Sequence, residues 1–237
     1  MRLVVTRPQA DGERTAEALR ARGHDVLLAP LMRIETVDAD LAGTWGAVII
    51  TSANAASALA GNPELATLCK LPCFSVGRRS AEAARQAGFA DVKSAGGDVR
   101  DLVRLIVAHK ADSKAPLLYI AGEDRAADLI GELTAHGIAA EMRIVYRAAT
   151  APFPPALVAA IKAGEVDAVL HFSKRSAENY LSGAAAAGIA REAQAVRHIC
   201  LSAQIASPLA AAGAARIAIA PRPDEAALIA SLDQAQA

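Results

Sequence analysis

Short apolar runs alternate with longer stretches of mixed polarity along the whole chain, and this alternation predicts strands separated by helices. We expect strands at about 3–6, 25–29, 46–51, 73–76, 91–94, 117–121, 139–146, 167–172, 198–201 and 216–220. We expect helices at about 11–22, 53–60, 78–87, 98–109, 125–136, 155–162, 174–186, 203–212 and 224–234. Such alternation is typical of parallel sheets covered by helices, so the sequence predicts an α/β protein.

Polar residues and glycines mark the ends of the expected helices. Helix starts are predicted at side chains that can accept a hydrogen bond from free backbone N–H groups, namely Ser52, Ser80, Asp98, Ser173 and Asp224. Helix ends are predicted at glycines, which tolerate the left-handed conformation, namely Gly23, Gly88, Gly137 and Gly213.

The whole pattern occurs twice in the same order. Leu3–Gly23 aligns without a gap with Leu117–Gly137, and WGAVIITSANAASAL from Trp45 matches DAVLHFSKRSAENYL from Asp167. Two later units also repeat, SVGRRSAEAARQAG as CLSAQIASPLAAAG and SAGGDVRDL as IAPRPDEAAL. A tandem duplication with small insertions accounts for this order. Two similar lobes in one chain are expected to form a cleft, which is a preferred place for small-molecule sites.

The pattern leaves two arrangements of the lobes open. The lobes could follow one another along the chain. Alternatively, the chain could leave the first lobe after about residue 34, build the second, and return near residue 148. The irregular stretches Pro30–Thr44 and Thr150–Pro155 are consistent with either arrangement.

Composition narrows the class of protein. The 237 residues are 53% hydrophobic, enough for two cores, and carry a net charge of zero, which gives no overall attraction to nucleic acid or membrane. The start MRLVVTRPQ lacks the features of a signal peptide, and no run approaches the roughly 18 apolar residues of a membrane span, so we expect a cytoplasmic protein. The cysteines Cys69, Cys73 and Cys200 are expected to be reduced and partly buried rather than zinc ligands.

Motifs for nucleotide cofactors, P-loops, zinc hydrolases and serine nucleophiles are missing from the sequence. The five histidines show no metal-ligand spacing, and His171, near a strand end, is expected either to face the cleft or to be satisfied by its neighbours. Ligands of α/β sheets bind where strands end and helices begin. The loops expected there carry hydroxyls, small residues and cations, at Thr6-Arg7, Thr51–Asn54, Gly77–Ser80, Gly122–Arg125 and Ser173–Arg175.

Helix N-termini with free N–H groups bind carboxylate or phosphate, and neighbouring Arg and Lys side chains reinforce that preference. These loops therefore predict binding of an anionic small molecule. The alternative is that the serines are only helix caps and the cations only solvated.

The ordered set of short motifs resembles the uroporphyrinogen-III synthase family over essentially the whole chain. The set comprises VTRP from Val5, TSANA from Thr51, SVGRRSA from Ser75, GGD from Gly96, VYR from Val145 and Phe172-Ser173. The resemblance implies two flavodoxin-like α/β lobes with parallel sheets flanked by helices, a two-stranded ladder joining them, and a cleft between lobes. Lobe one would comprise residues 1–34 and 149–237, lobe two residues 38–144, and the ladder residues 31–37 and 142–149.

The activity implied by the resemblance is cyclisation of hydroxymethylbilane to uroporphyrinogen III, with loss of water and inversion of ring D through a spiro intermediate. No metal and no organic cofactor are implied. The expected catalytic residue is Tyr146, whose alternative role is packing at the hinge. The expected substrate-binding residues are Thr6, Arg7, Ser52, Ala53, Asn54, Gly77, Ser80, Gly122, Arg125, Ser173 and Ser202.

One departure from the family pattern lies before the last alanine-rich helix. The family typically has a glycine and a Thr pair there, whereas this chain has Ser202, Gln204 and Ile205. Two alternatives are open: Ser202 or Gln204 supplies the hydrogen bond instead, or the loop contacts the substrate by its backbone alone. We expect a monomer that receives its substrate from the upstream bilane-forming enzyme and binds neither nucleic acid nor membrane. The rival interpretations are a non-catalytic two-lobed sensor or binding protein for an anionic metabolite, and a small glycosyltransferase.

Overall fold

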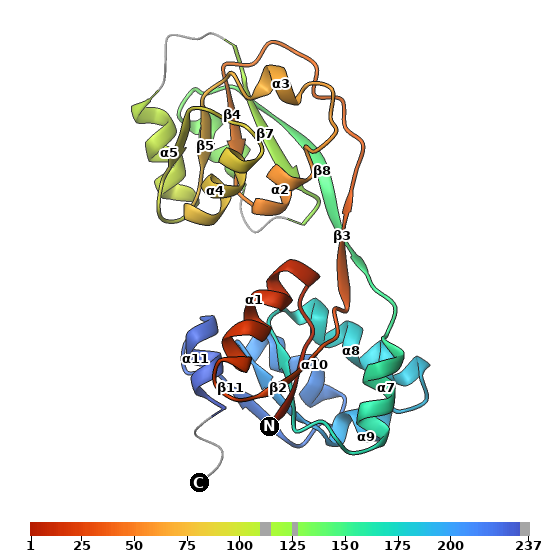
Figure 1. Cartoon of the computed structure of the whole chain (residues 1–237). Coiled ribbons are helices and arrows are strands. Elements are labelled where there is room, and N and C mark those ends of the chain that lie inside the picture. The colour runs from red at the N-terminus through yellow and green to blue at the C-terminus, as the bar shows by residue number, and fades with distance from the viewer. Residues whose placement is uncertain (110–114, 125–127, 233–237) are drawn as a thin grey trace. The chain divides into compact units, whose positions relative to one another are not determined.

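The computed structural model describes residues 1–109, 115–124 and 128–232, and it divides into two compact units. Unit 1 comprises Met1–Arg33 and Ala149–Ala237, and unit 2 comprises Ile34–Ala148. Figure 1 shows helices on both faces of a sheet in each unit. Each unit is therefore a three-layer α/β structure.

The sheet of unit 1 has five parallel strands in the order β11-β10-β9-β1-β2. The strands are β1 (Arg2–Val5), β2 (Asp25–Leu28), β9 (Ala168–His171), β10 (Arg197–Cys200) and β11 (Ile217–Ile219). One face packs against α7 (Pro155–Lys162), α8 (Lys174–Ala186), α9 (Ala190–Ala195) and α10 (Ala203–Ala211), the other against α1 (Gln9–Arg20) and α11 (Glu225–Ala230). Because β1 and β9 are buried on both faces, each contains an unbroken apolar run, Leu3–Val5 and Ala168–Leu170, rather than an alternating pattern.

The sheet of unit 2 has six strands in the order β3-β8-β7-β4-β5-β6. They are β3 (Met32–Thr36), β4 (Ala47–Ile50), β5 (Cys73–Ser75), β6 (Val92–Ser94), β7 (Leu117–Gly122) and β8 (Ala140–Thr150). One face packs against α2 (Ala53–Ser57), α3 (Leu65–Leu68) and α4 (Arg78–Gln86), the other against α5 (Val99–Ala108) and α6 (Leu129–Ala135).

The two sheets share one order once the duplicated elements are matched. β1 and β2 correspond to β7 and β8 by sequence, and β9, β10 and β11 correspond to β4, β5 and β6. However, β1 pairs with β9, whereas β7 pairs with β4. The opening strands of the two copies are therefore exchanged. The chain builds part of unit 1, then all of unit 2, and then returns, as in the crossed arrangement.

The stretch Pro30–Thr44, predicted from the pattern as irregular, contains strand β3. This strand is the hydrogen-bonded neighbour of β8, and the boundary between the units falls within both strands (Figure 1). On one side the amide of Val37 donates to the carbonyl of Val145 at 2.8 Å, and on the other the amide of Ala151 donates to that of Leu31 at 3.1 Å. Residue numbers rise in opposite directions along this ladder, so β3 and β8 are antiparallel.

Four of the five predicted helix caps are confirmed. The side chains of Ser52, Asp98, Ser173 and Asp224 each accept a hydrogen bond from a backbone N–H of the helix that follows. The prediction for Ser80 is wrong, because α4 begins earlier, with extended Gly77 in the cap position. The four glycines predicted to close helices all have positive φ, from 70° to 108°, as the left-handed conformation requires.

Candidate functional site

The carboxyl edge of the unit 2 sheet gathers residues from four adjacent strands, in the order β8-β7-β4-β5. Tyr146 lies on β8, Gly122 ends β7, Ser52 follows β4 and Gly77 follows β5. Strands that run parallel end at the same edge of their sheet, so these residues share that edge although up to about 94 positions separate them in sequence. This edge is the candidate site in unit 2.

Tyr146 is half-buried, and its ring packs against the core formed on the α2, α3 and α4 face. Its register partner on β7 is Gly122, at a β-bulge that follows Ala121. Within the described part of the chain, no hydrogen bond to the Tyr146 hydroxyl is present. The phenol therefore keeps its donor and acceptor capacity for a ligand.

A second phenol, absent from the predicted site, lies at the same edge. The Tyr119 hydroxyl is 3.1 Å from the hydroxyl of Thr51, the residue after β4. Tyr119 is 5% exposed and sits inside the apolar run of β7, so its sequence position indicates only a core residue. Its hydroxyl orients Thr51 at the start of the TSANA segment.

Hydrogen bonds fix the starts of the helices at this edge. Ser52 caps α2 by accepting from the amide of Asn54 at 3.2 Å, and Ala53 opens that helix. Ser80 is buried, and its hydroxyl donates to the carbonyl of Gly77 at 3.0 Å and faces the Gly77 amide at 3.3 Å. Ser80 therefore engages both backbone polar groups of Gly77 and fixes the shape of this loop. Arg125 lies outside the described residues.

The carboxyl edge of the unit 1 sheet carries Ser202 after β10, Ser173 after β9 and Thr6-Arg7 after β1, three adjacent strands. Ser173 caps α8 through the amide of Ser176 at 3.1 Å. Ser202 occupies the cap position of α10 without a side-chain cap hydrogen bond, so its hydroxyl is the one not consumed by its own helix. Thr6 is fully buried and its hydroxyl donates to the carbonyl of Leu170, so its side chain is structural.

Arg7 is held by groups from distant parts of the chain. Its guanidinium donates to Glu225 at 2.9 Å and to the Thr15 hydroxyl at 3.0 Å, and it lies over the Phe172 ring, 4.4 Å from the centroid. Burial alone would raise the pKa of Glu225, but the hydrogen bond from Thr15 and the charge of Arg7 outweigh burial and lower that pKa. Arg7, predicted to meet the substrate, thus has a carboxylate partner within unit 1.

His171 does not stand at the ligand-facing surface. It is fully buried, and its Nε2 lies 3.1 Å from Nδ1 of His198 on the neighbouring strand. Burial lowers the pKa of His171 well below its ordinary value, and His198 adds to that effect. Burial also lowers the pKa of His198 to about 4. The two rings are therefore neutral core groups, and no feature of the sequence indicates that they meet.

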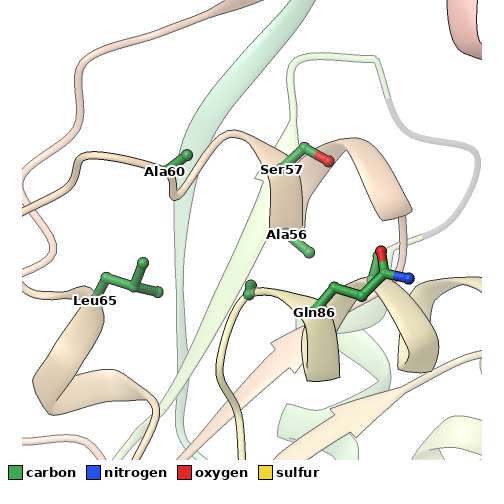
Figure 2. Close-up of a pocket in the computed structure, with 7 residues that line it drawn as sticks. Ala56, Ser57, Ala60, Leu65 and Gln86 are labelled. Carbon is green, nitrogen blue, oxygen red and sulfur yellow. The ribbon is translucent and has the colours of Figure 1, made fainter.

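Pockets of about 430 Å³ lie elsewhere on unit 2. One lies among α2, α3 and α4 and is lined by small and apolar side chains with Gln86, as Figure 2 shows. No predicted site residue lines it. A second pocket is lined by Arg78, Arg79 and Arg85 together with Ala81, Glu82 and Ser94. Its arginines include two of the cations predicted near the strand ends.

No cluster of three or more potential metal ligands occurs in the parts of the chain that the structure describes. Within those same residues, no helix combines the length and the apolar content needed to cross a bilayer. The thiols of Cys69, Cys73 and Cys200 are free, and burial raises the pKa of both Cys73 and Cys200 to about 12.

Comparison with known proteins identifies the family. No curated protein sequence matches the chain. The solved structure of uroporphyrinogen-III synthetase from Helicobacter pylori 26695 is similar, with a TM-score of 0.67 at 18% identity over 99% of both chains, and shows the fold. Wild-type uroporphyrinogen III synthase from Thermus thermophilus matches with a TM-score of 0.47 at 19% identity, over 100% of this chain and 98% of that one. The family model described as uroporphyrinogen-III synthase HemD matches residues 13–230. The chain therefore belongs to the uroporphyrinogen-III synthase family.

Proposed function

We propose that this chain converts hydroxymethylbilane into uroporphyrinogen III, with loss of water and inversion of ring D. The observation that carries the proposal is the family match over residues 13–230, nearly the whole chain. The strand-end edges agree with it, because they offer hydroxyls and helix N-termini suited to the acetate and propionate groups of the substrate. The reaction belongs to the synthesis of tetrapyrroles.

The reaction requires the protein mainly to hold the bilane in one conformation. The bilane loses its hydroxyl readily to give an azafulvene, and unaided it closes to the isomer without inversion. In the proposed mechanism the substituted carbon of ring D attacks the azafulvene carbon and forms a spiro intermediate, which opens and recloses with ring D inverted. Orientation of this kind contributes on the order of 7–11 kcal/mol in well-placed intramolecular reactions.

We assign departure of the hydroxyl to Tyr146. The C–O bond breaks with its electron pair on oxygen, and the phenol transfers its proton to that oxygen, which leaves as water. Its half-buried position at the edge of unit 2, with no protein partner for the hydroxyl among the described residues, suits a donor to substrate. Loss of a proton from ring D at the end restores the aromatic pyrrole, and that proton returns to the phenolate of Tyr146, so the protons balance over one turnover.

Anchoring of the substrate is assigned to the two strand-end edges. In unit 2 the proposed contacts are the amides and hydroxyls of Ser52, Ala53, Asn54, Gly77 and Gly122. In unit 1 they are Ser173 and Ser202, of which Ser202 has the uncommitted hydroxyl. Thr6, Arg7 and Ser80 stabilise these loops and are not assigned to the substrate, because their polar groups are bonded to the protein.

Further parts of the proposal concern the setting of the reaction. We place it in the cytoplasm, where free thiols such as those of Cys69, Cys73 and Cys200 persist. The working form proposed is a monomer that takes the bilane from the enzyme upstream. In its support, the exposed large hydrophobic side chains among the described residues are only Val107 and Ile219.

The reaction is proposed to need no metal, so EDTA should leave turnover unchanged. A loss of turnover that zinc or magnesium restored would contradict this.

The decisive experiment supplies freshly made hydroxymethylbilane and separates the product isomers after oxidation to porphyrins. The proposal requires type III product at a rate well above that of the protein-free control. Type I product alone, at the uncatalysed rate, would leave the chain as a binding protein for an anionic metabolite. Heat-denatured protein at equal concentration is the matched control.

A further inference from the structure

Gly122 and Tyr146 face each other across β7 and β8 with no room for a side chain at position 122. They are register partners at the β-bulge that ends β7. A Cβ atom on Gly122 would lie 2.7 Å from both the hydroxyl oxygen and Cε2 of Tyr146. Carbon side-chain atoms essentially never approach that closely, so a side chain at position 122 would have to push the phenol away.

Backbone conformation does not explain the glycine. Nine glycines of the described chain have positive φ, and Gly122 is not one of them. Its backbone is therefore open to any residue, and the obstacle to a side chain is Tyr146 itself. The absence of a Cβ is what allows the phenol to lie over the end of β7.

Packing, rather than a hydrogen bond, determines where the phenol lies. The backbone of Tyr146 is fixed on β8, where its carbonyl accepts from the amide of Glu123 at 3.0 Å. Its ring packs against the core on one face of the sheet, but no protein group among the described residues bonds its hydroxyl. A small displacement of the ring would therefore carry the hydroxyl with it.

We infer that Gly122 is a positioning residue, which fixes the Tyr146 hydroxyl at the point where it meets the leaving oxygen of the substrate. This inference rests on the proposed function and adds a residue that acts through the tyrosine. In the sequence, Gly122 stands out only as a small residue in a strand-end loop, a place that predicts direct contact with the substrate. The structure adds an indirect role, which acts through the tyrosine, to the direct contact proposed above.

The first test measures position without activity. The chain contains three tyrosines, Tyr119, Tyr146 and Tyr180, so labelling with 3-fluorotyrosine gives three ¹⁹F resonances, and Tyr146→Phe assigns one of them. Gly122→Ala should shift the Tyr146 resonance and leave that of Tyr180 in place. The matched control is Gly183→Ala, whose new Cβ would lie 2.8 Å from Cγ of Phe153, a ring that packs on Tyr180. That variant should shift the Tyr180 resonance and leave the Tyr146 resonance in place.

The second test measures turnover in a double-mutant cycle. Gly122→Ala should lower kcat about 100-fold, the loss typical of a misplaced reacting group, with KM changed less than about twofold. In a Tyr146→Phe background the same substitution should change kcat little, because the hydroxyl that it displaces is already gone. Gly183→Ala should leave kcat unchanged.

Three results would overturn the inference. They are an unmoved Tyr146 resonance in Gly122→Ala, an equal kcat loss from Gly122→Ala with and without the phenol, and a rise in KM alone. If Gly122→Ala does not fold, Gly122→Ala with Tyr146→Ala decides: a folded double variant supports the inference, and an unfolded one contradicts it. Wild-type protein that forms no type III product would reject the proposed function and still leave the fluorine test of position valid.

Discussion

His171 Nε2 lies 3.1 Å from His198 Nδ1 inside the core of unit 1, with both side chains fully buried. One ring must donate and the other accept, since a single proton lies between facing imidazole nitrogens. The Tyr180 ring packs edge-on against both histidines, with centroids 5.4 and 5.5 Å away. The remaining nitrogens, His171 Nδ1 and His198 Nε2, make no hydrogen bond of normal geometry with the described residues. Two neutral histidines carry two protons between them, and a third would give the pair a positive charge. Burial keeps water from stabilising that charge.

We therefore expect the free energy of unfolding to decrease as pH falls below about 6.5. The unfolded chain takes up protons on these histidines near pH 6.5, whereas burial lowers the folded pKa of both, to about 4 for His198. Their contribution is fully present above pH 6.5 and is lost on acidification, with a slope of at most about 1.4 kcal/mol per pH unit for each histidine. Urea midpoints between about pH 7.5 and 5.5 measure it. The double variant His171→Leu/His198→Leu should show a flatter profile; a wild-type midpoint that stays constant would contradict the prediction.

Tyr146→Phe should lower kcat about 100- to 10,000-fold, the range typical of lost general acid assistance. The fold, KM and the type III product should persist, because ring placement rather than the phenol selects the isomer. Stopped assays with fresh bilane, followed by isomer separation, measure both quantities. Tyr180→Phe is the control, since among the described residues its hydroxyl bonds only the Ala193 carbonyl, in the core of unit 1. Wild-type kcat in Tyr146→Phe would reduce the residue to packing, and type I product would show that it positions ring D.

Arg7→Met should destabilise unit 1 by about 2 kcal/mol, because it leaves the half-buried Glu225 carboxylate without its 2.9 Å partner. Adding Glu225→Gln should recover part of the loss, as removal of both charges does for a paired site. Denaturant unfolding of the two single variants and the double variant measures the coupling. Strictly additive losses would show that the pair does not interact in solution.

Ser173→Ala and Ser202→Ala should separate stability from binding. Ser173 caps α8, so its loss should cost about 1 kcal/mol, whereas Ser202 makes no cap bond and its loss should cost almost nothing. Both substitutions should raise KM for the bilane. Parallel melting and kinetic assays check this, and an unchanged KM in Ser202→Ala would remove that hydroxyl from the proposed substrate contacts.

Substrate binding should weaken with salt although the net charge is zero. Cations stand near strand ends in both units, such as Arg78, Arg147 and Lys174, and screening reduces their attraction for a polycarboxylate. KM is therefore expected to rise between about 0.02 and 0.5 M salt, while kcat stays constant. A KM independent of salt would mean that short-range amide contacts, rather than charge, hold the substrate.

The elements that could be predicted from sequence are those with a local cause. Strand β4 lies within its expected range because an unbroken apolar run has few alternatives to a strand buried on both faces. Strand β3 has no such run; it is a strand because β8 pairs with it from more than about 100 residues away. The expected helix 78–87 begins where α4 does, but its cap could not be recognised from a side chain, because the cap residue, Gly77, has none.

The same limit applies to the candidate site. Strand-end serines could be recognised because capping is a short-range signal. Ser52 and Ser173 cap their helices as expected, and Ser202 occupies the cap position of α10. The pairing of Arg7 could not be recognised, since Glu225 is 218 residues away. Nor could the role of Gly122, which depends on one aromatic ring in a neighbouring strand. These contacts join residues that are far apart in sequence, so they form only when the sheet is assembled.

The exchange of opening strands orders events during synthesis of the chain. Unit 2 is continuous from Ile34 to Ala148, so all its strands have been made once the ribosome has passed Ala148. Strand β1, in contrast, pairs with β2 and β9, and β9 begins only at Ala168. A β-α-β fragment alone is too small to be stable, so the first 30 or so residues must wait unfolded while the whole of unit 2 is made. The segment Met1–Arg33 is thus made before unit 2, but its sheet can be completed only after unit 2 has been made.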